Sequence, residues 1–358
     1  MTIDGRLGGE DGQAHAPPAN TPKIGVLPNP KHPDFRDTQS LVLPLDRVCT
    51  PDDPQVRQMR AREAAVRGTA QDRVNFLLYE VFVRTPDVSH ILSVVDELLN
   101  FAGLFQNPGG MRILAPSGMG KNALLHFLLR KYPSQPLGPK PLYPLVYVHF
   151  REVLAAGDIL RALLNQMNCA YQNYQSVQDL EDCLLDAIDT CGTQGVIFNE
   201  TQHMLSAAKG AGRISARVAG KTGDWLKGFL DRLKRAVFFL GVPGWDEAFQ
   251  LDPQLGSRIP HRYELSAFKP DKDFTAVLWA LDQAIPMPAP AGLANRDLAQ
   301  KLFDVCKGTW RPLIFLLRDA IISATRRGSP RIEDCDLSWA YHLQFGLKGD
   351  PFGSPPKR

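Results

Sequence analysis

The sequence predicts an α/β fold in which helices cover a parallel sheet, followed by a small all-α domain. Three observations support this prediction. Between residues 106 and 268, short apolar segments alternate with longer segments of helical periodicity, which is typical of a parallel sheet covered on both faces. A glycine-rich turn with a lysine follows the first of these apolar segments. From residue 269 onward, helical segments follow one another with no apolar strand between them.

Residues 1–55 are expected to form a flexible N-terminal arm. They are rich in proline and glycine and show little helical periodicity, so they cannot bury enough apolar surface to offset the entropy lost on ordering. Residues 56–105 are expected to form helices that pack ahead of the core. A charged, solvated helix is expected over 51–68, and amphipathic helices over 71–83 and 89–101.

The α/β core is expected over residues 106–268 and a helical lid over 269–348, with a flexible tail over 349–358. Five buried segments are expected to be strands: 111–115, 145–150, 195–198, 236–241 and 262–265. Three helices are expected between them, ending near residues 131, 167 and 191. The lid helices are expected at 271–285, 295–306, 312–326 and 332–345.

The segment 112–122, R-I-L-A-P-S-G-M-G-K-N, has the pattern of a phosphate-binding loop between a strand and a helix. Glycines let backbone N–H groups approach phosphate oxygens, and the start of the following helix adds its positive dipole end. Lys121 would reach the outer phosphates as a point charge. The residues expected to bind the phosphates are Pro116, Ser117, Gly118, Met119, Gly120, Lys121, Asn122 and Ala123.

This loop departs from the pattern G-x-x-x-x-G-K-[ST] at two positions. Ala115 stands where the first glycine is usual, and Asn122 stands where a Ser or Thr hydroxyl would bind Mg²⁺. An Asn carbonyl can still serve as a neutral oxygen ligand. Tight packing at a strand-to-helix turn is an alternative interpretation of the small residues. A nucleophilic Ser117 is disfavoured, because Ala115 and Met119 replace the glycines of a nucleophile elbow.

The segment 195–200, G-V-I-F-N-E, fits the second half of a nucleotide site, on a strand expected next to the loop strand. Glu200 would be the general base that activates water. Asn199 replaces the usual Asp, so both expected Mg²⁺ positions, Asn122 and Asn199, are amides. This pair predicts weakened hydrolysis. The alternative is that Glu200 is a surface carboxylate at the end of a strand.

Two arginines are candidates for contacting the γ-phosphate. Arg258 precedes the fifth strand and suits a finger that reaches the site of a neighbouring subunit, whereas Arg311 opens a lid helix and suits a sensor within the chain. Each could instead be a solvated surface residue.

Composition limits the cellular setting. The net charge of +3 over 358 residues is too small to indicate a nucleic-acid partner by itself. No apolar run approaches the ~18–20 residues of a membrane span. The six cysteines lack C-x-x-C and zinc-type spacings, so reduced thiols in a soluble, cytoplasmic protein without a membrane partner are expected. They are Cys49, Cys169, Cys183, Cys191, Cys306 and Cys335.

The blocks M-R-I-L-A-P-S-G-M-G-K-N, V-I-F-N-E-T-Q-H-M-L, F-F-L-G-V-P-G and D-P-Q-L-G-S-R resemble the TniB and TnsC group of AAA+ ATPases, which are transposition regulators related to MuB. The likeness covers roughly residues 71–345. By motif, Lys121 resembles the phosphate lysine, Glu200 the catalytic glutamate and Arg258 the trans-acting finger. Val242 occupies a sensor position that is usually polar, a further sign of weakened hydrolysis.

This resemblance implies a P-loop AAA+ core with a lid, binding ATP and Mg²⁺. It also implies a homo-oligomer, either a ring or a helical filament, that coats double-stranded DNA. Such an oligomer would recruit a DDE transposase to target DNA and meet a target-selection protein of TniQ type. A non-enzymatic, ATP-gated DNA-binding scaffold is the first alternative. A helicase-loader or signalling ATPase without a transposase partner is the second.

Charge placement independently favours a DNA contact. Residues 207–235 carry eight Lys and Arg residues against two Asp, a net charge of +6 within a chain of +3. The glycine-containing first half of this segment could follow a phosphate backbone without reading bases, through Lys209, Arg213, Arg217 and Lys221. The alternatives are a solvated basic surface or a contact with the adjacent subunit.

Overall fold

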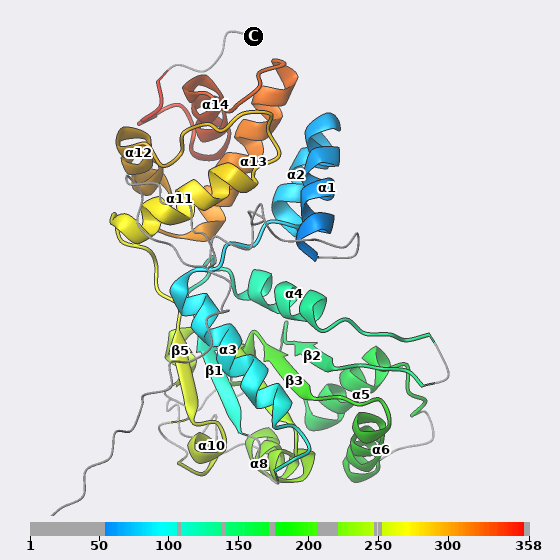
Figure 1. Cartoon of the computed structure of the whole chain (residues 1–358). Coiled ribbons are helices and arrows are strands. Elements are labelled where there is room, and N and C mark those ends of the chain that lie inside the picture. The colour runs from blue at the N-terminus through cyan, green and yellow to red at the C-terminus, as the bar shows by residue number, and fades with distance from the viewer. Residues whose placement is uncertain are drawn as a thin grey trace, which may run out of the picture.

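The computed structural model describes residues 54–105, 109–137, 140–152, 154–171, 176–205, 221–246, 249 and 253–353. These residues form an α/β part and a helical part that lie one above the other (Figure 1). The expected N-terminal arm lies outside the described residues, except for its last two positions, which begin the first helix. Within the described residues, no helix combines the length and apolar character needed to cross a lipid bilayer.

The sheet of the α/β part has five parallel strands in the order β2-β3-β4-β1-β5. The strands are β1 Gly110–Leu114, β2 Leu145–His149, β3 Gly195–Asn199, β4 Ala236–Gly241 and β5 His261–Glu264. The expectation that β3 adjoins the loop strand β1 is wrong. Strand β4 lies between them, with Leu240 paired to Ile113 on one side and to Asn199 on the other. Every residue of β4 is apolar and buried. Such a strand suits a central position, because helices cover both faces of the sheet there.

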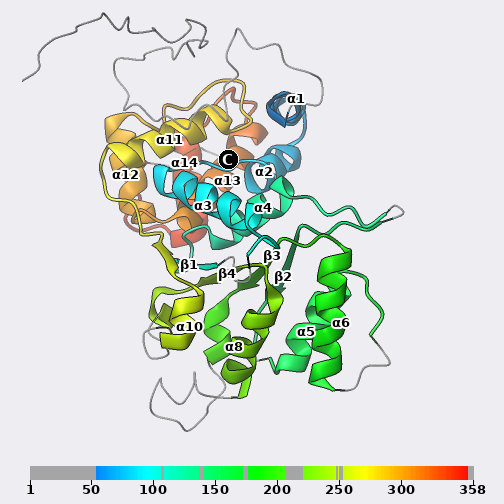
Figure 2. The ribbon, with the colours of Figure 1, turned by 60° about the horizontal axis from the view of Figure 1, so that its bottom comes forward.

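Helices cover both faces of this sheet, as the apolar pattern predicts (Figure 2). On one face, α3 Pro86–Asn100 and α4 Lys121–Lys131 pack against β1, β3 and β4, with Ile91 and Leu124 in the shared apolar cluster. On the other face lie α5 Ala156–Gln166, α6 Val177–Thr190 and α8 Lys221–Leu233. The short helices η2 Thr201–Leu205, η3 Pro243–Asp246 and α10 Pro253–Arg258 connect the later strands.

The helical part contains four helices from the C-terminal region and two from the N-terminal region. They are α11 Lys272–Ala284, α12 Arg296–Cys306, α13 Trp310–Arg326, α14 Asp334–Phe345, α1 Pro54–Arg67 and α2 Ala70–Tyr79. Val74 and Leu77 of α2 are buried in the same apolar cluster as Leu317 of α13. From α1, the Arg62 guanidinium donates to the carbonyl oxygens of Ile285 (3.0 Å) and Met287 (3.2 Å).

The N-terminal helices therefore do not pack as one group ahead of the core. Helix α3 covers the sheet, whereas α1 and α2 join the lid. The expected flexible tail also differs at its start. Phe352 is 5% exposed and lies in the lid cluster, and the Ser338 hydroxyl donates to the Asp350 carboxylate at 2.6 Å. An aromatic side chain of this size is stabilised by such burial. Residues 354–358 lie outside the described part of the chain.

Candidate nucleotide-binding site

The turn between β1 and α4 has the geometry of a phosphate-binding loop. Gly118 and Gly120 have φ values of +86° and +88°, a region that side chains other than glycine rarely adopt. A Cβ atom added to Gly118 would lie 3.1 Å from the Cβ of Arg311. Both the backbone conformation and the close approach of α13 therefore require glycine at position 118. Helix α4 begins at this turn without a side-chain cap at Gly120, which leaves its first N–H groups available to an anion.

A cavity of about 330 Å³ opens next to this turn, near the lower end of the usual size range of ligand pockets. Six of the eight predicted phosphate-binding residues line it: Ser117, Gly118, Gly120, Lys121, Asn122 and Ala123. Pro116 and Met119 are not among its described lining residues. Met119 is 3% exposed within the core below α4, and its N–H donates to the Pro116 carbonyl at 3.3 Å. The buried Met119 side chain therefore anchors the loop in the apolar core, and its N–H bonds within the loop.

Lys121 lies at the base of the cavity and is 6% exposed. Its Nζ donates to the carbonyl oxygen of Ala115 at 2.7 Å. Burial lowers the pKa of this amine, and the nearby Glu200 carboxylate opposes the shift. The ammonium group is thus withdrawn from water and held by neutral oxygens, an arrangement in which an added phosphate would interact with it strongly.

Glu200 follows β3 directly and lines the same cavity. Its φ of +57° is unusual for a residue with a side chain, and such conformations concentrate at functional sites. The carboxylate accepts a hydrogen bond from Nε2 of Gln202 at 2.5 Å. Glu200 and Lys121 thus line the same cavity with opposite charges.

Asn122 and Asn199 are brought together, as expected of two residues of one site. Asn199 is 1% exposed, and its Nδ2 donates to Oδ1 of Asn122 at 3.0 Å. The same Nδ2 lies 2.9 Å from Nδ1 of His149, at the end of β2. Oδ1 of Asn199 is buried without a hydrogen-bonding partner among the described residues.

This arrangement fits poorly with Mg²⁺ ligation by Asn122 and Asn199. A divalent cation needs oxygen ligands, preferably charged ones. Oδ1 of Asn122 already accepts one hydrogen bond, and Asn199 presents its NH₂ group to Asn122, which leaves the neutral Oδ1 of Asn199 as the unpartnered oxygen of the pair. Glu200 is the only carboxylate among the described residues that line the cavity. We therefore derive no catalytic step through a metal ion.

Arg311 lies at the cavity, at the start of α13. Its Nη1 donates to the Ser117 hydroxyl at 3.0 Å, and its backbone N–H donates to the Gly118 carbonyl at 3.1 Å. The guanidinium is thus positioned beside the loop that would hold the phosphates. These contacts also connect the lid directly to the phosphate-binding loop.

Arg258 does not reach the cavity of its own chain. It ends α10, which leads into the amino end of β5, whereas the loop follows the carboxyl end of the parallel strand β1 (Figure 1). Its Nε and Nη2 each donate to the Asp231 carboxylate at 2.7 Å. A contact between Arg258 and a bound phosphate would therefore require a second subunit.

Sequence reasoning did not single out four residues that line the cavity: Gln202, Trp310, Ile314 and Phe315. Three of them lie on the first two turns of α13, next to Arg311. The available signal was the spacing of Ile314 and Phe315, three and four residues after Arg311 and so on the same face of the helix. Val242, the predicted apolar sensor position, also lines the cavity. His149 was missed because nothing local to β2 indicates its contact with Asn199.

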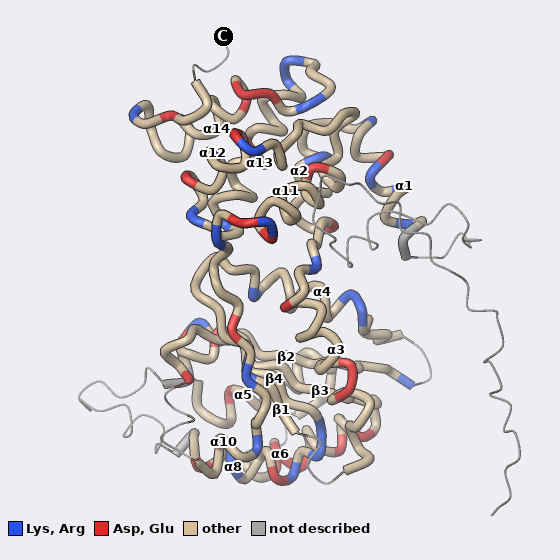
Figure 3. The backbone as a smooth tube through the Cα atoms, turned by 60° about the vertical axis from the view of Figure 1, so that its left-hand side comes forward, with Lys and Arg blue, Asp and Glu red and all other residues tan. Residues whose placement is uncertain are grey.

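The predicted DNA-binding loop falls mostly outside the described residues, which exclude Lys209, Arg213 and Arg217. Lys221 is the first residue of α8. In the described part of the chain, Lys and Arg residues are spread over both the α/β and helical parts (Figure 3). Three of the eight cationic residues of segment 207–235 thus lie outside the described residues.

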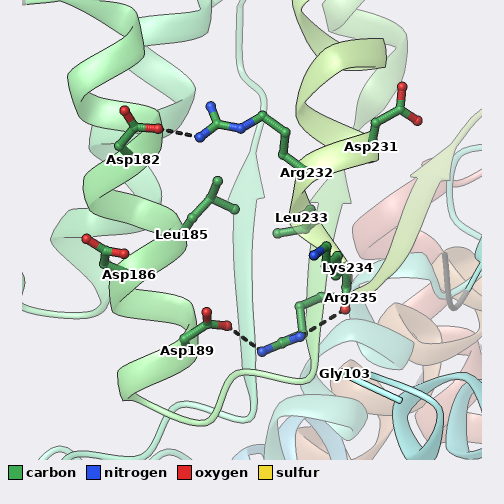
Figure 4. Close-up of a pocket in the computed structure, with 10 residues that line it drawn as sticks. All are labelled: Gly103, Asp182, Leu185, Asp186, Asp189, Asp231, Arg232, Leu233, Lys234 and Arg235. Atoms are coloured by element: carbon green, nitrogen blue, oxygen red, sulfur yellow. Dashed lines mark hydrogen bonds and ion pairs between the residues drawn. The ribbon is translucent and has the colours of Figure 1, made fainter. Parts of the chain in front are cut away.

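A second cavity, of about 630 Å³, lies between α6 and α8 (Figure 4). Charged pairs cross it: Arg232 contacts Asp182, and Arg235 donates to Asp189 at 2.5 Å. Asp182 and Asp189 are exposed, and such surface pairs contribute little to stability. The described candidate site residues do not line this cavity, so we assign it no part in nucleotide binding.

Solved structures with the same arrangement of elements define the fold class. The Aeropyrum pernix ORC2 protein in ADPNP–ADP complexes is 19% identical, with a TM-score of 0.54 over 75% of this chain and 69% of that chain. The Aeropyrum pernix ORC1 protein in complex with DNA is 17% identical, with a TM-score of 0.54 over the same shares. Cdc6p from Pyrobaculum aerophilum is 18% identical, with a TM-score of 0.51 over 75% and 70%. The chain thus has an AAA+ fold, a P-loop α/β core with a helical C-terminal domain.

The family follows from the sequence. Residues 73–269, more than half of the chain, match the family described as Bacterial TniB protein. The chain therefore belongs to the TniB family, which confirms the resemblance seen in the four motif blocks. No curated protein matches the sequence.

Proposed function

We propose that this chain is an ATP-binding transposition regulator with slow ATP hydrolysis. The observation that carries the proposal is that three predicted residues line one cavity: Lys121 at the start of α4, Glu200 directly after β3 and Arg311 in the lid. A buried cation, a carboxylate and a second cation around a glycine loop suit a nucleoside triphosphate whose terminal phosphate is attacked by water. The ADPNP and ADP bound to the similar ORC2 protein support an adenine nucleotide.

Glu200 would orient the attacking water, and Arg311 would neutralise charge on the terminal phosphate. Hydrolysis is slow in this proposal for two reasons. The wall of the cavity has the apolar Val242 where a polar sensor would position water, and Asn122 and Asn199 satisfy each other rather than a cation. A scaffold that binds ATP without hydrolysing it is the second candidate function, favoured by the same two observations.

We further propose that the active form is a homo-oligomer, as a ring or helical filament on double-stranded DNA in the cytoplasm. Arg258 lies away from the cavity of its own chain, which suits a role in the cavity of the next subunit. The TniB family supports partnership with a transposase and a target-selection protein of TniQ type. The similar ORC1 protein bound to DNA supports a DNA partner.

Phosphate release from ATP, measured with and without duplex DNA, tests the proposal. We expect slow release that is lost in Glu200→Gln, because the variant keeps the size of the side chain but removes the base. Lys121→Ala supplies the background. Release no greater than this background would favour the scaffold, and failure of the wild-type chain to bind ATP would contradict both candidate functions.

Neutralising Lys209, Arg213 and Arg217 together by substitution with Gln tests the DNA contact. We expect weaker binding to duplex DNA and a shallower dependence of log Kd on log salt, by about 2–3 units of slope if all three contact phosphates. Fluorescence anisotropy at several salt concentrations measures both quantities. A matched control is the Gln variant of Lys272 in α11, Lys301 in α12 and Lys269 just before α11. Unchanged affinity and slope in the first variant would exclude the loop as the contact.

A further inference from the structure

We infer that this chain binds its nucleoside triphosphate without a divalent cation, because Asn122, Asn199 and His149 form a hydrogen-bonded amide–imidazole cluster, without a carboxylate, where a cation would otherwise be held. This inference rests on the proposed nucleotide binding and specifies the form of the ligand. Its ligand is the metal-free triphosphate, recognised by side-chain cations and backbone N–H groups.

The first step concerns the donors of Asn199. An Asn side chain has two N–H donors and one carbonyl oxygen. Here Nδ2 contacts both Oδ1 of Asn122 (3.0 Å) and Nδ1 of His149 (2.9 Å), so both donors have acceptors in the tautomer that leaves Nδ1 of His149 unprotonated. The oxygen lies on the other branch of the amide and is buried without a partner. The group that Asn199 presents to Asn122 is therefore an NH₂ group, which repels a cation.

The opposite orientation of this amide gives the same result. With Oδ1 of Asn199 facing its two neighbours, it would accept from the NH₂ group of Asn122 and from a protonated Nδ1 of His149. Both lone pairs of the oxygen would then be occupied. The free amide oxygen is Oδ1 of Asn199 in the first orientation and Oδ1 of Asn122 in the second. Each orientation therefore offers a cation one free neutral oxygen, and neither offers the carboxylate that an Asp at position 199 would supply.

The second step concerns charge. Two cationic side chains, Lys121 and Arg311, line the cavity, against the single described carboxylate of Glu200. The cavity is thus positive before any metal ion enters, and its buried ammonium group interacts with phosphate in a low-dielectric setting. Mg²⁺ is held in such sites by one or two carboxylates together with phosphates. Asn122 and Asn199 supply none, so the metal would add little to affinity.

Equilibrium binding of a non-hydrolysable ATP analogue to the full chain tests this inference. Calorimetric titrations are run once with excess MgCl₂ and once with EDTA. We expect Kd values within about 3-fold of each other, or about 0.7 kcal/mol. Binding at least ~10-fold weaker in EDTA would overturn the inference and leave the proposed function intact. Absence of binding in both buffers would contradict the proposed function itself.

Variants that restore a carboxylate supply the second measurement. Asn199→Asp should create a cation ligand and make binding at least ~10-fold tighter with Mg²⁺ than with EDTA. Because Asn199 is buried, Asn122→Asp at the exposed neighbouring position serves as an independent variant. The control is Asn165→Asp, an exposed position on α5, which should leave the Kd ratio near 1. Folded Asn122→Asp and Asn199→Asp variants that both keep the wild-type ratio would overturn the role of the amide cluster.

Discussion

Replacing Lys121 with alanine is expected to weaken ATP binding by about 2–5 kcal/mol, which is ~30-fold or more in Kd. The reason is that Lys121 is the buried cation of the cavity, and its Nζ is held 2.7 Å from the Ala115 carbonyl at the foot of the loop. Removing it leaves the phosphate oxygens nearest the loop without their counter-charge. Calorimetric titration with ATP measures the change.

The matched control is Lys131→Ala, at the other end of the same helix α4. Lys131 is partly exposed and pairs with Asp96, so its removal should leave the Kd for ATP unchanged. The melting temperature of each variant shows whether the fold is kept. Equal Kd values for Lys121→Ala and the wild-type chain would contradict the assignment of this cavity as the nucleotide site.

Combining Asn122→Thr with Asn199→Asp is expected to raise ATP turnover by about 10-fold or more, equivalent to at least ~1.4 kcal/mol off the barrier. The pair replaces two amides that bond to each other with a hydroxyl and a carboxylate, the groups that bind Mg²⁺ in phosphate-loop ATPases. Steady-state phosphate release at saturating ATP and Mg²⁺ measures the effect.

The same pair placed in a Glu200→Gln background is the control, and it should remain inactive because the general base is absent. Turnover that stays at the wild-type rate would contradict the view that these two positions limit hydrolysis. The apolar Val242 in the cavity wall would then be the next position to change.

Strands β1 to β4 could be predicted from sequence because each is a short, largely apolar run in a sheet covered on both faces. The buried pattern of β3 and β4 illustrates this, since every residue of both strands is buried. Their order could not be predicted, because apolar runs of similar composition carry no information about which neighbour each will pair with. The place of β4 between β1 and β3 is a property of the assembled sheet.

The packing of α2 on the lid had no sequence signal either. Its apolar residues Val74 and Leu77 show that one face must be buried, but periodicity does not say which element covers that face.

The candidate site could likewise be predicted only in part. The glycines and Lys121 are constrained locally by the loop and were predictable, whereas the contacts of His149 with Asn199 and of Arg311 with Ser117 join residues far apart in sequence. Such contacts form only when the fold brings the two segments together, so the sequence of either segment alone could not predict them.

The inclusion of α1 and α2 in the helical part has a mechanical consequence. The chain crosses between the two parts twice, once after α2 and again between β5 and α11, and Figure 1 shows both crossings at the waist of the molecule. Any swing of Arg311 away from Ser117 that moves the helical part as one body would have to bend both crossings together. Stiffening either crossing, for example with proline, should therefore restrict that movement.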